Sequence, residues 1–200
     1  MTDSVMFHEG NRRLQDQFES RRISDRLEEF CRKEFTPEDR VFIESAPYFF
    51  LATANAEGQP DCSFKGGMPG FVTVTGPSEL AFPDYDGNGM FKSLGNIGVN
   101  SHVSLLFIAM HGRPRRLRVA GTANVLTDDP LMESTVGAQL MIRVTARAIF
   151  PNCPRYIPQL ELKGASPYVP VAAQPFLEPE WKSADWASDV VHPRHPTYRG

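Results

Sequence analysis

Residues 103–126, with the sequence VSLLFIAMHGRPRRLRVAGTANVL, contain the two strand patterns that decide the fold. Val103–Met110 is a continuous apolar run of strand length, which favours a strand buried on both faces. Beyond the turn at His111–Pro114, apolar and polar residues alternate along Arg115–Leu126, which predicts a second strand with one face toward a core. The apolar face comprises Leu117, Val119, Gly121, Ala123 and Val125, and the polar face comprises Arg116, Arg118, Thr122 and Asn124.

Strand patterns continue on both sides of this pair. About seven strands, joined mostly by tight turns with one helical crossover, favour an antiparallel barrel over a parallel α/β sheet. No glycine-rich dinucleotide turn follows the first strand, which argues against a Rossmann fold. The further predicted strands are Tyr48–Ala54, Pro60–Lys65, Phe71–Thr75, Glu79–Pro83 and Gln139–Phe150. In the last of these, the even-numbered residues from Leu140 to Phe150 form the apolar face.

Helical patterns flank the strands. Apolar residues recur at helical spacing between Arg12 and Lys33, which predicts one amphipathic helix or a helix pair. Thr36 and Pro37 are typical of a helix start, and this second helix is expected to end near Ser45. Two shorter helices are predicted, Met90–Val99 and about two turns that begin at Thr127–Pro130.

The segment after Pro151 differs in composition from the rest of the chain. Nine prolines stand between Pro151 and Gly200, with Pro151 included, and only Cys153–Leu162 could form a helical turn or two. The segment also holds Phe176, Leu177, Trp181 and Trp186, which favours an extended arm packed on its own barrel or a neighbour's, the alternative being a partly mobile terminus. We therefore divide a single structural domain into an N-terminal helical segment (1–46), a barrel core (47–151) and a proline-rich arm (152–200).

Composition excludes several classes of protein. The net charge of −3 argues against a dedicated nucleic-acid binder. Cys31, Cys62 and Cys153 are scattered, which indicates reduced thiols, and the histidines lack metal-ligand spacing; His192 and His195 come closest, in the proline-rich tail. Without a secretory signal pattern or an apolar run of about 20 residues, the cytoplasm is the expected compartment and no membrane partner is expected.

Two segments combine cations, glycines and backbone N–H groups. Lys65 stands at a strand end before Gly66 and Gly67, which suits a polar ring edge or a phosphate as well as a plain turn. The glycine-containing segment from Asp84 leads into a helix whose first turn holds Lys92 and Ser93. Such a helix start can bind a phosphate or can be an ordinary loop-to-helix cap.

Two further segments are weaker candidates. Arg116 and Arg118 share the polar face of their strand, where they could guard a solvated edge or point into a ligand cleft. Cys153 has no nearby histidine in sequence and no helix-start context, so a packed structural thiol is favoured over a nucleophile. Arg155 and Tyr156 are candidates for contact with a substrate.

Five segments stand in a specific order and spacing along the chain. They are FFLAT (49–53), DCSFKGG (61–67), PDYDGN (83–88), SLGNI (93–97) and LRVAGTA (117–123). Together they resemble the pyridoxamine 5′-phosphate oxidase-like FMN-binding proteins, within them a bacterial branch, over roughly residues 40–160. The resemblance implies a mainly β fold with flanking helices, a six-stranded antiparallel split β-barrel. It also implies a homodimer with two FMN sites at the subunit interface.

The resemblance also assigns roles by position. Phe64 and Lys65 match the strand-end pair that lies along the flavin ring, and Lys92 and Ser93 match the family's basic phosphate-binding pair, with serine in place of a usually basic residue. Arg116 matches a polar residue that reaches the flavin from the facing strand. The full cofactor-binding set is Ser63, Phe64, Lys65, Gly66, Pro83, Asp84, Asn88, Lys92, Ser93 and Arg116. No catalytic residue and no metal ligand is assigned.

Two departures from the family pattern limit the functional expectation. Pro60 stands where the true oxidases have an arginine that grips the phosphate, and their C-terminal substrate motif is not recognisable here. We therefore expect an FMN-dependent oxidoreductase acting on a small molecule, with NADH or NADPH as a possible donor, rather than an oxidase of B6 vitamers. The alternative is a binding or sensing module for flavin, deazaflavin (F420) or haem without turnover.

Overall fold

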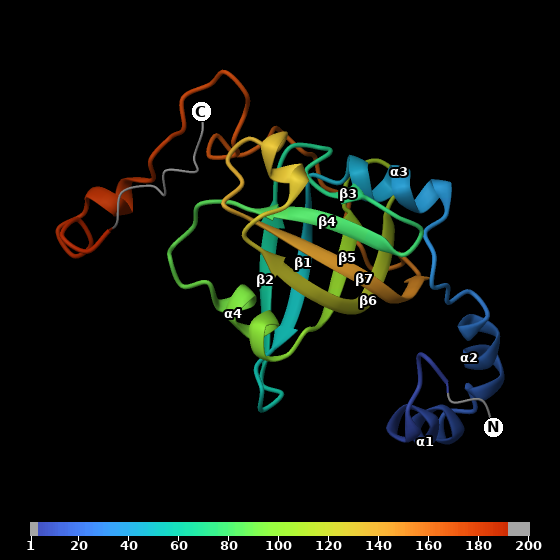
Figure 1. Ribbon diagram of the computed structural model, residues 1–200. Coiled ribbons are helices and arrows are strands. Elements are labelled where there is room, and N and C mark those ends of the chain that lie inside the picture. Colours follow the sequence, from blue (N-terminus) through green and yellow to red (C-terminus); the bar gives the residue numbers. More distant parts are fainter. Residues whose placement is uncertain (1–3, 192–200) are drawn as a thin grey trace.

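The computed structural model describes residues 4–191, which form an antiparallel split barrel with helices around it (Figure 1). One seven-stranded sheet has the order β2-β1-β5-β6-β7-β4-β3, and all neighbours are antiparallel. The strands are β1 (Tyr48–Ala54), β2 (Pro60–Gly66), β3 (Thr73–Val74), β4 (Glu79–Asp84), β5 (His102–Ala109), β6 (Arg115–Leu126) and β7 (Leu140–Pro151). The fold is the one expected, and the strand beyond the expected six is accounted for by the two-residue β3.

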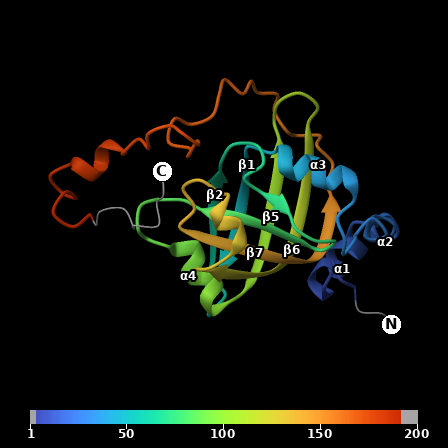
Figure 2. The ribbon, with the colours of Figure 1, turned by 45° about the horizontal axis from the view of Figure 1, so that its top comes forward.

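The helices lie outside the curved sheet. They are α1 (Glu9–Gln17), α2 (Arg21–Glu28), α3 (Pro37–Ser45) and α4 (Lys92–Val99), with single 3-10 turns η1 (Pro130–Glu133) and η2 (Glu180–Ser183). Figures 1 and 2 show α3 and α4 on opposite sides of the barrel and the α1–α2 pair beyond one end of it. The predicted pair is confirmed, and the chain reverses between α1 and α2 at Glu19, whose φ is 52°.

The core fills the inner face of the sheet. Phe49 lies at its centre, with its ring centroid 4.9 Å from that of Phe82 and 5.1 Å from that of Phe107. Ile43 of α3 is fully buried and closes one side. Full burial of one such side chain contributes about 1.5–3 kcal/mol. The ring contacts of Phe49 with Phe82 and Phe107 therefore help to hold β1, β4 and β5 together.

Strand β5 is buried on one face only, contrary to the prediction from its continuous apolar run. Val103, Leu105 and Phe107 enter the core, whereas Leu106 and Ile108 point outward and are half-buried. An apolar run therefore marks an outer face that a single subunit does not cover.

A bulge between β6 and β7 changes the predicted face of Phe150. The register shifts at Ala120/Gly121, so Ile149 enters the core opposite Val119 while Phe150 pairs with outward-facing Arg118. Gly121 makes the shift possible, since a Cβ there would lie 2.0 Å from the carbonyl oxygen of Thr145. The strict alternation expected for this strand is wrong beyond the bulge.

Three helix predictions need correction. The segment after Thr127 forms only η1, one 3-10 turn, instead of two helical turns. Helix α4 begins at Lys92 rather than Met90, because Phe91 is left-handed with φ 46°. Residues 153–162 form no helix, consistent with Pro154 and Pro158, which lack the N–H group that a helix needs.

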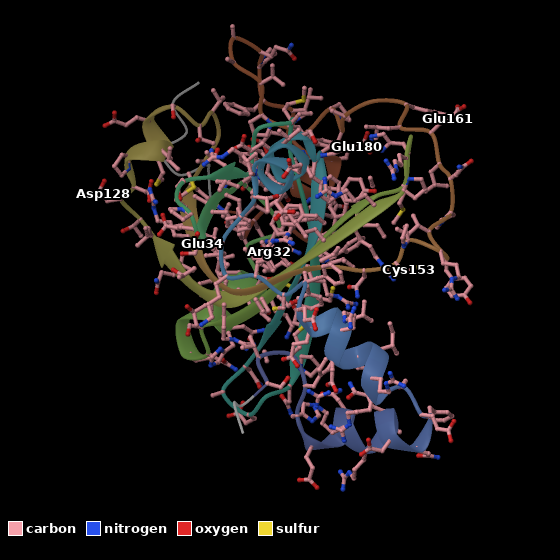
Figure 3. All side chains as sticks on the ribbon, turned by 90° about the vertical axis from the view of Figure 1, so that its right-hand side faces the viewer. Arg32, Glu34, Asp128, Cys153, Glu161 and Glu180 are labelled. Atoms are coloured by element: carbon pink, nitrogen blue, oxygen red, sulfur yellow. The ribbon has the colours of Figure 1, made fainter. Side chains whose placement is uncertain are left out.

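The described part of the tail packs partly on its own chain. Figure 3 shows Cys153 and Glu161 on the tail as it leaves β7. The N–H of Leu160 donates to the carbonyl of Met110 over 2.7 Å, and Lys182 forms an ion pair with Asp86. His192 and His195 lie outside the described residues. Within 4–191, no helix is long and apolar enough to cross a membrane.

Candidate functional site

Polar side chains line the inner face of β2, an edge strand of the sheet. Ser63 pairs in register with Leu51 and Lys65 with Phe49, and both partners are fully buried in the core. Paired residues share a face, so Ser63 and Lys65, together with Asp61, point inward. Within the described chain, β1 is the strand that pairs with β2, so these groups lie at an edge of the sheet.

Helix α4 meets this face at its first turn. The hydroxyls of Ser63 and Ser93 lie 2.9 Å apart, and Ser93 is only 5% exposed. Ser93 Oγ also lies 3.5 Å from a carboxylate oxygen of Asp61. Within the described chain no side chain caps α4, and Lys92 is exposed beside Ser93. We call Asp61, Ser63, Lys92, Ser93 and the first turn of α4 the β2–α4 cradle.

An ion pair lies further along the same face. Lys65 Nζ is 3.7 Å from Asp84 Oδ1 at the end of β4, and both side chains are largely buried. Gln139 Nε2 donates to the other Asp84 oxygen over 2.8 Å. Burial raises the pKa of Asp84, while the bond from Gln139 and the charge of Lys65 oppose that rise. The pair bridges β2 and β4, which are not hydrogen-bonded neighbours in the sheet.

Two predicted residues lie on the opposite, outer face. Phe64 is 61% exposed, and its ring stacks on Tyr48 with centroids 5.4 Å apart. Arg116 donates to the carbonyl of Cys153, and its Nε is buried without a hydrogen-bond partner among residues 4–191. Arg116 lies on β6, where it pairs with Ile108 of β5. Strand β6 is three strand spacings from β2, or about 14 Å along the sheet. Within one subunit these side chains do not join the cradle.

The remaining predicted residues surround these two groups. Gly66 follows Lys65, and a Cβ there would lie 2.7 Å from the ring of Phe64. Pro83 is buried in β4 opposite Met141. Asn88 is exposed, and its side-chain oxygen accepts from the N–H of Met90 over 3.1 Å.

The weaker candidates lie elsewhere on the surface. Arg118 donates to the side chain of Asn152 over 2.9 Å. Tyr156 is 89% exposed, and its ring centroid lies 5.9 Å from the guanidinium of Arg155. Cys153 is exposed, so the packed thiol predicted there is wrong, since the chain leaves the barrel surface at this point.

Cavities adjoin the barrel at two places in the described part of the chain. One of about 280 Å³ lies between the loop after β4 and the tail, where Tyr85 and Asn88 face Tyr168, Phe176 and Trp181. Burial raises the pKa of Tyr85 to about 12. A larger one, about 600 Å³, lies at the C-terminal end of α4, and Arg143, which lines it, is already paired with Glu79 and Asp129. Of the predicted cofactor-binding set, Asn88 alone lines the smaller cavity, and no member lines the larger one.

Sequence reasoning missed three contributors to this region. Asp61, to which the sequence analysis assigned no role, accepts a hydrogen bond from Ser93. Gln139 donates to Asp84, although the two residues are 55 positions apart in the chain. Asn96 of α4 donates to buried Thr53 over 3.0 Å and ties the helix to β1. Strand alternation places Asp61 on the face of Ser63, which was a usable signal; the other two contacts have no local signature.

The donor groups of the cradle fit a phosphorylated ring compound such as FMN. The hydroxyls of Ser63 and Ser93, the cation of Lys92 and the uncapped N–H groups of α4 are the donors that a phosphate and a sugar-like chain require. Lys65 lies two residues beyond Ser63 on the same face of β2, about 7 Å along the strand, where it could contact the polar edge of a ring. Asp61 is the one member of the cradle that only accepts hydrogen bonds when ionised.

Comparison with known proteins gives a family match. A family model described as "Pyridoxamine 5'-phosphate oxidase" matches residues 35–165. These residues include all strands of the barrel, α3 and α4, and every residue of the predicted cofactor-binding set. None of the curated proteins matches the chain.

Several solved structures are similar to this chain. HupZ from Group A Streptococcus is 19% identical with a TM-score of 0.48, over 58% of this chain and 93% of its own. HutZ, the haem storage protein from Vibrio cholerae, is 17% identical with a TM-score of 0.40, over 60% and 92%. An FMN-binding protein from Syntrophomonas wolfei is 9% identical with a TM-score of 0.46, over 70% and 97%.

Proposed function

The chain belongs to the pyridoxamine 5′-phosphate oxidase family, and from this premise we propose that it is a homodimer that binds FMN between its subunits and acts as an oxidoreductase on a small molecule. The observation that carries the proposal is the β2–α4 cradle, in which Ser63 and Ser93 meet 2.9 Å apart at an uncapped helix start. In the cradle, β2 lies against the start of α4, two segments that the sequence analysis identified separately as candidates.

The cradle would hold the phosphate end of the cofactor. Backbone N–H groups at a helix start and the partial positive charge of the helix dipole favour an anion. Lys92 adds a full charge at the first helical position. The buried hydroxyl of Ser93 adds a donor that the fold already holds in place, so little ordering is required when a ligand binds.

The Lys65–Asp84 pair would lie toward the ring end. When bound, FMN supplies the hydride and electron transfer of the proposed reaction. Lys65 would hold a positive charge near the polar edge of the ring, where it favours negative charge. Asp84 and Gln139 fix the position of Lys65 from β4 and from the residue before β7.

The outer sheet face supports the proposed dimer. Tyr48, Phe50 and Phe64 form an aromatic cluster there, and half-buried Leu106 and Ile108 extend it across β5. A contiguous apolar surface of this kind is typical of a protein interface. In a dimer, Arg116 would then face the partner's cofactor rather than its own, which accounts for its distance from the cradle.

The absorbance spectrum of protein purified from its host tests the cofactor directly. FMN, a deazaflavin and haem have distinct visible spectra, and mass spectrometry of the released compound identifies it. We expect a flavin spectrum and the mass of FMN. A haem or deazaflavin spectrum would show that the cofactor is not FMN. Protein that is colourless and takes up no added flavin would refute the proposal.

Turnover is tested separately from binding. We expect NADH, NADPH or a candidate small molecule to reduce the bound flavin, seen as bleaching of its absorbance without oxygen. A bound flavin that none of these reduces would favour a storage or sensing role. Oxidation of B6 vitamers is not expected, because the C-terminal substrate motif of the true oxidases is not recognisable in this chain.

A further inference from the structure

Asp61 places a carboxylate within the β2–α4 cradle. Its side chain points inward from β2, and the distance from Asp61 Oδ2 to Ser93 Oγ is 3.5 Å. The same Ser93 hydroxyl lies 2.9 Å from that of Ser63 and is shielded from solvent. The Ser93 hydroxyl therefore contacts an anionic acceptor as well as the hydroxyl of Ser63.

A carboxylate and a phosphate compete for such a position. Both are anions that accept hydrogen bonds and are attracted to a helix N-terminus. A phosphate oxygen that accepted from Ser93 Oγ would lie close to Asp61, since both would contact one hydroxyl. In a partly buried site, two like charges at that separation repel. The hydroxyls of an unphosphorylated chain meet no such repulsion, because they can donate to the carboxylate.

We propose that Asp61 is a specificity-determining residue, which lowers the affinity of the cradle for FMN relative to riboflavin, the same flavin without the phosphate. This inference rests on the proposed function, since it requires a flavin in the cradle. The neighbouring residue, Pro60, adds no charge to offset Asp61, and Lys92 is the cation at the first position of α4. With Asp61 present, the cradle therefore prefers FMN over riboflavin less strongly than it would without this carboxylate.

Fluorescence titration of the full chain with FMN and with riboflavin tests the inference. Asp61→Asn keeps the size of the side chain and removes its charge. We expect this variant to bind FMN about tenfold more tightly and to change riboflavin binding by less than about twofold. Asp61→Ser should show the same selectivity, because it also removes the charge.

The matched control is Glu34→Gln, which makes the same change of charge at an exposed residue before α3 (Figure 3). It should leave both affinities unchanged. Thermal unfolding of each variant checks that the fold is intact, and a variant that does not fold is replaced by the other Asp61 substitution.

The outcomes separate this inference from the proposed function. If wild-type protein binds FMN and removal of the Asp61 charge gives no gain, or an equal gain with riboflavin, the specificity role is overturned and FMN binding stands. If wild-type protein binds neither flavin, the proposed function fails and this inference fails with it.

Discussion

Lys92 is the residue whose charge most directly serves the proposed phosphate site. It occupies the first position of α4, and its side chain is exposed and available to a ligand. We expect Lys92→Ala to weaken FMN binding by about 1–3 kcal/mol through loss of a charge-assisted contact. Flavin fluorescence titration measures this, with Lys33→Ala as a control at an exposed lysine near α3. Unchanged affinity would remove Lys92 from the site.

Asp129 gives stability a predictable dependence on pH. Its buried carboxylate accepts from Arg143 Nε over 2.5 Å and from the N–H of Leu131 over 2.9 Å. The bond from Arg143, aided by that from Leu131 and by the charge of Arg143, lowers the pKa of Asp129 below its ordinary value of 3.8. The folded state thus binds this proton less readily than the unfolded state, so the stabilisation is present above that value and is lost as pH falls through the lowered pKa.

We expect Asp129→Asn to lower the free energy of unfolding at neutral pH by about 1–3 kcal/mol. The difference from wild type should shrink as pH falls below 3.8, the ordinary value. Urea unfolding across this pH range measures it. A difference that stayed constant with pH would show that the charge of Asp129 is not what stabilises the fold.

Residue-scale prediction from sequence succeeds where strand alternation applies. It placed Arg116 and Arg118 on one face of β6 and Leu117 and Val119 on the other, as the structure does. The same rule separates Phe64 from Lys65, although positional resemblance had grouped them. Contacts between distant segments, such as that of Gln139 with Asp84, depend on sheet register and were out of reach.

At the scale of elements, the β6–β7 bulge is fixed by Gly121. A Cβ at this position would lie 2.0 Å from the Thr145 carbonyl oxygen, and backbone cannot move aside as a flexible side chain can. We expect Gly121→Ala to lower the free energy of unfolding by about 1–3 kcal/mol or more, measured by chemical denaturation.

Gly98→Ala in α4 is the matched control, since nothing lies within 4 Å of the added Cβ. It should be neutral or stabilise by up to about 1 kcal/mol, because alanine favours a helix. If both variants lost equal stability, crowding at Gly121 would not be the cause.

Element boundaries were predictable where local chemistry sets them. Thr36 and Asp39 form a capping box at the start of α3, and the strand limits of β1 match the predicted ones. The start of α4 was missed because it depends on the left-handed backbone of Phe91, a conformation that a bulky residue seldom adopts. The bulge was missed because one glycine in a strand does not reveal which partner residue is skipped.

At the scale of the whole molecule, the outer sheet face predicts self-association. Phe64 is 61% exposed in a single subunit, so its replacement should spare folding. We expect Phe64→Glu to raise the dimer dissociation constant at least about a hundredfold, because a charge would enter an apolar interface from both subunits. Sedimentation velocity at several concentrations measures this.

Val41→Glu serves as the control, since Val41 is 68% exposed on α3, away from the aromatic cluster. It should leave the dimer intact. A Phe64→Glu variant that remained dimeric would place the interface elsewhere.

The most direct test of an FMN site shared between subunits is sedimentation of the native protein with detection in the flavin absorbance band. The account predicts that this absorbance moves with a species of two subunits and corresponds to one flavin per subunit. Flavin that sediments with a single subunit, or a dimer that holds none and takes up none when FMN is added, would contradict it.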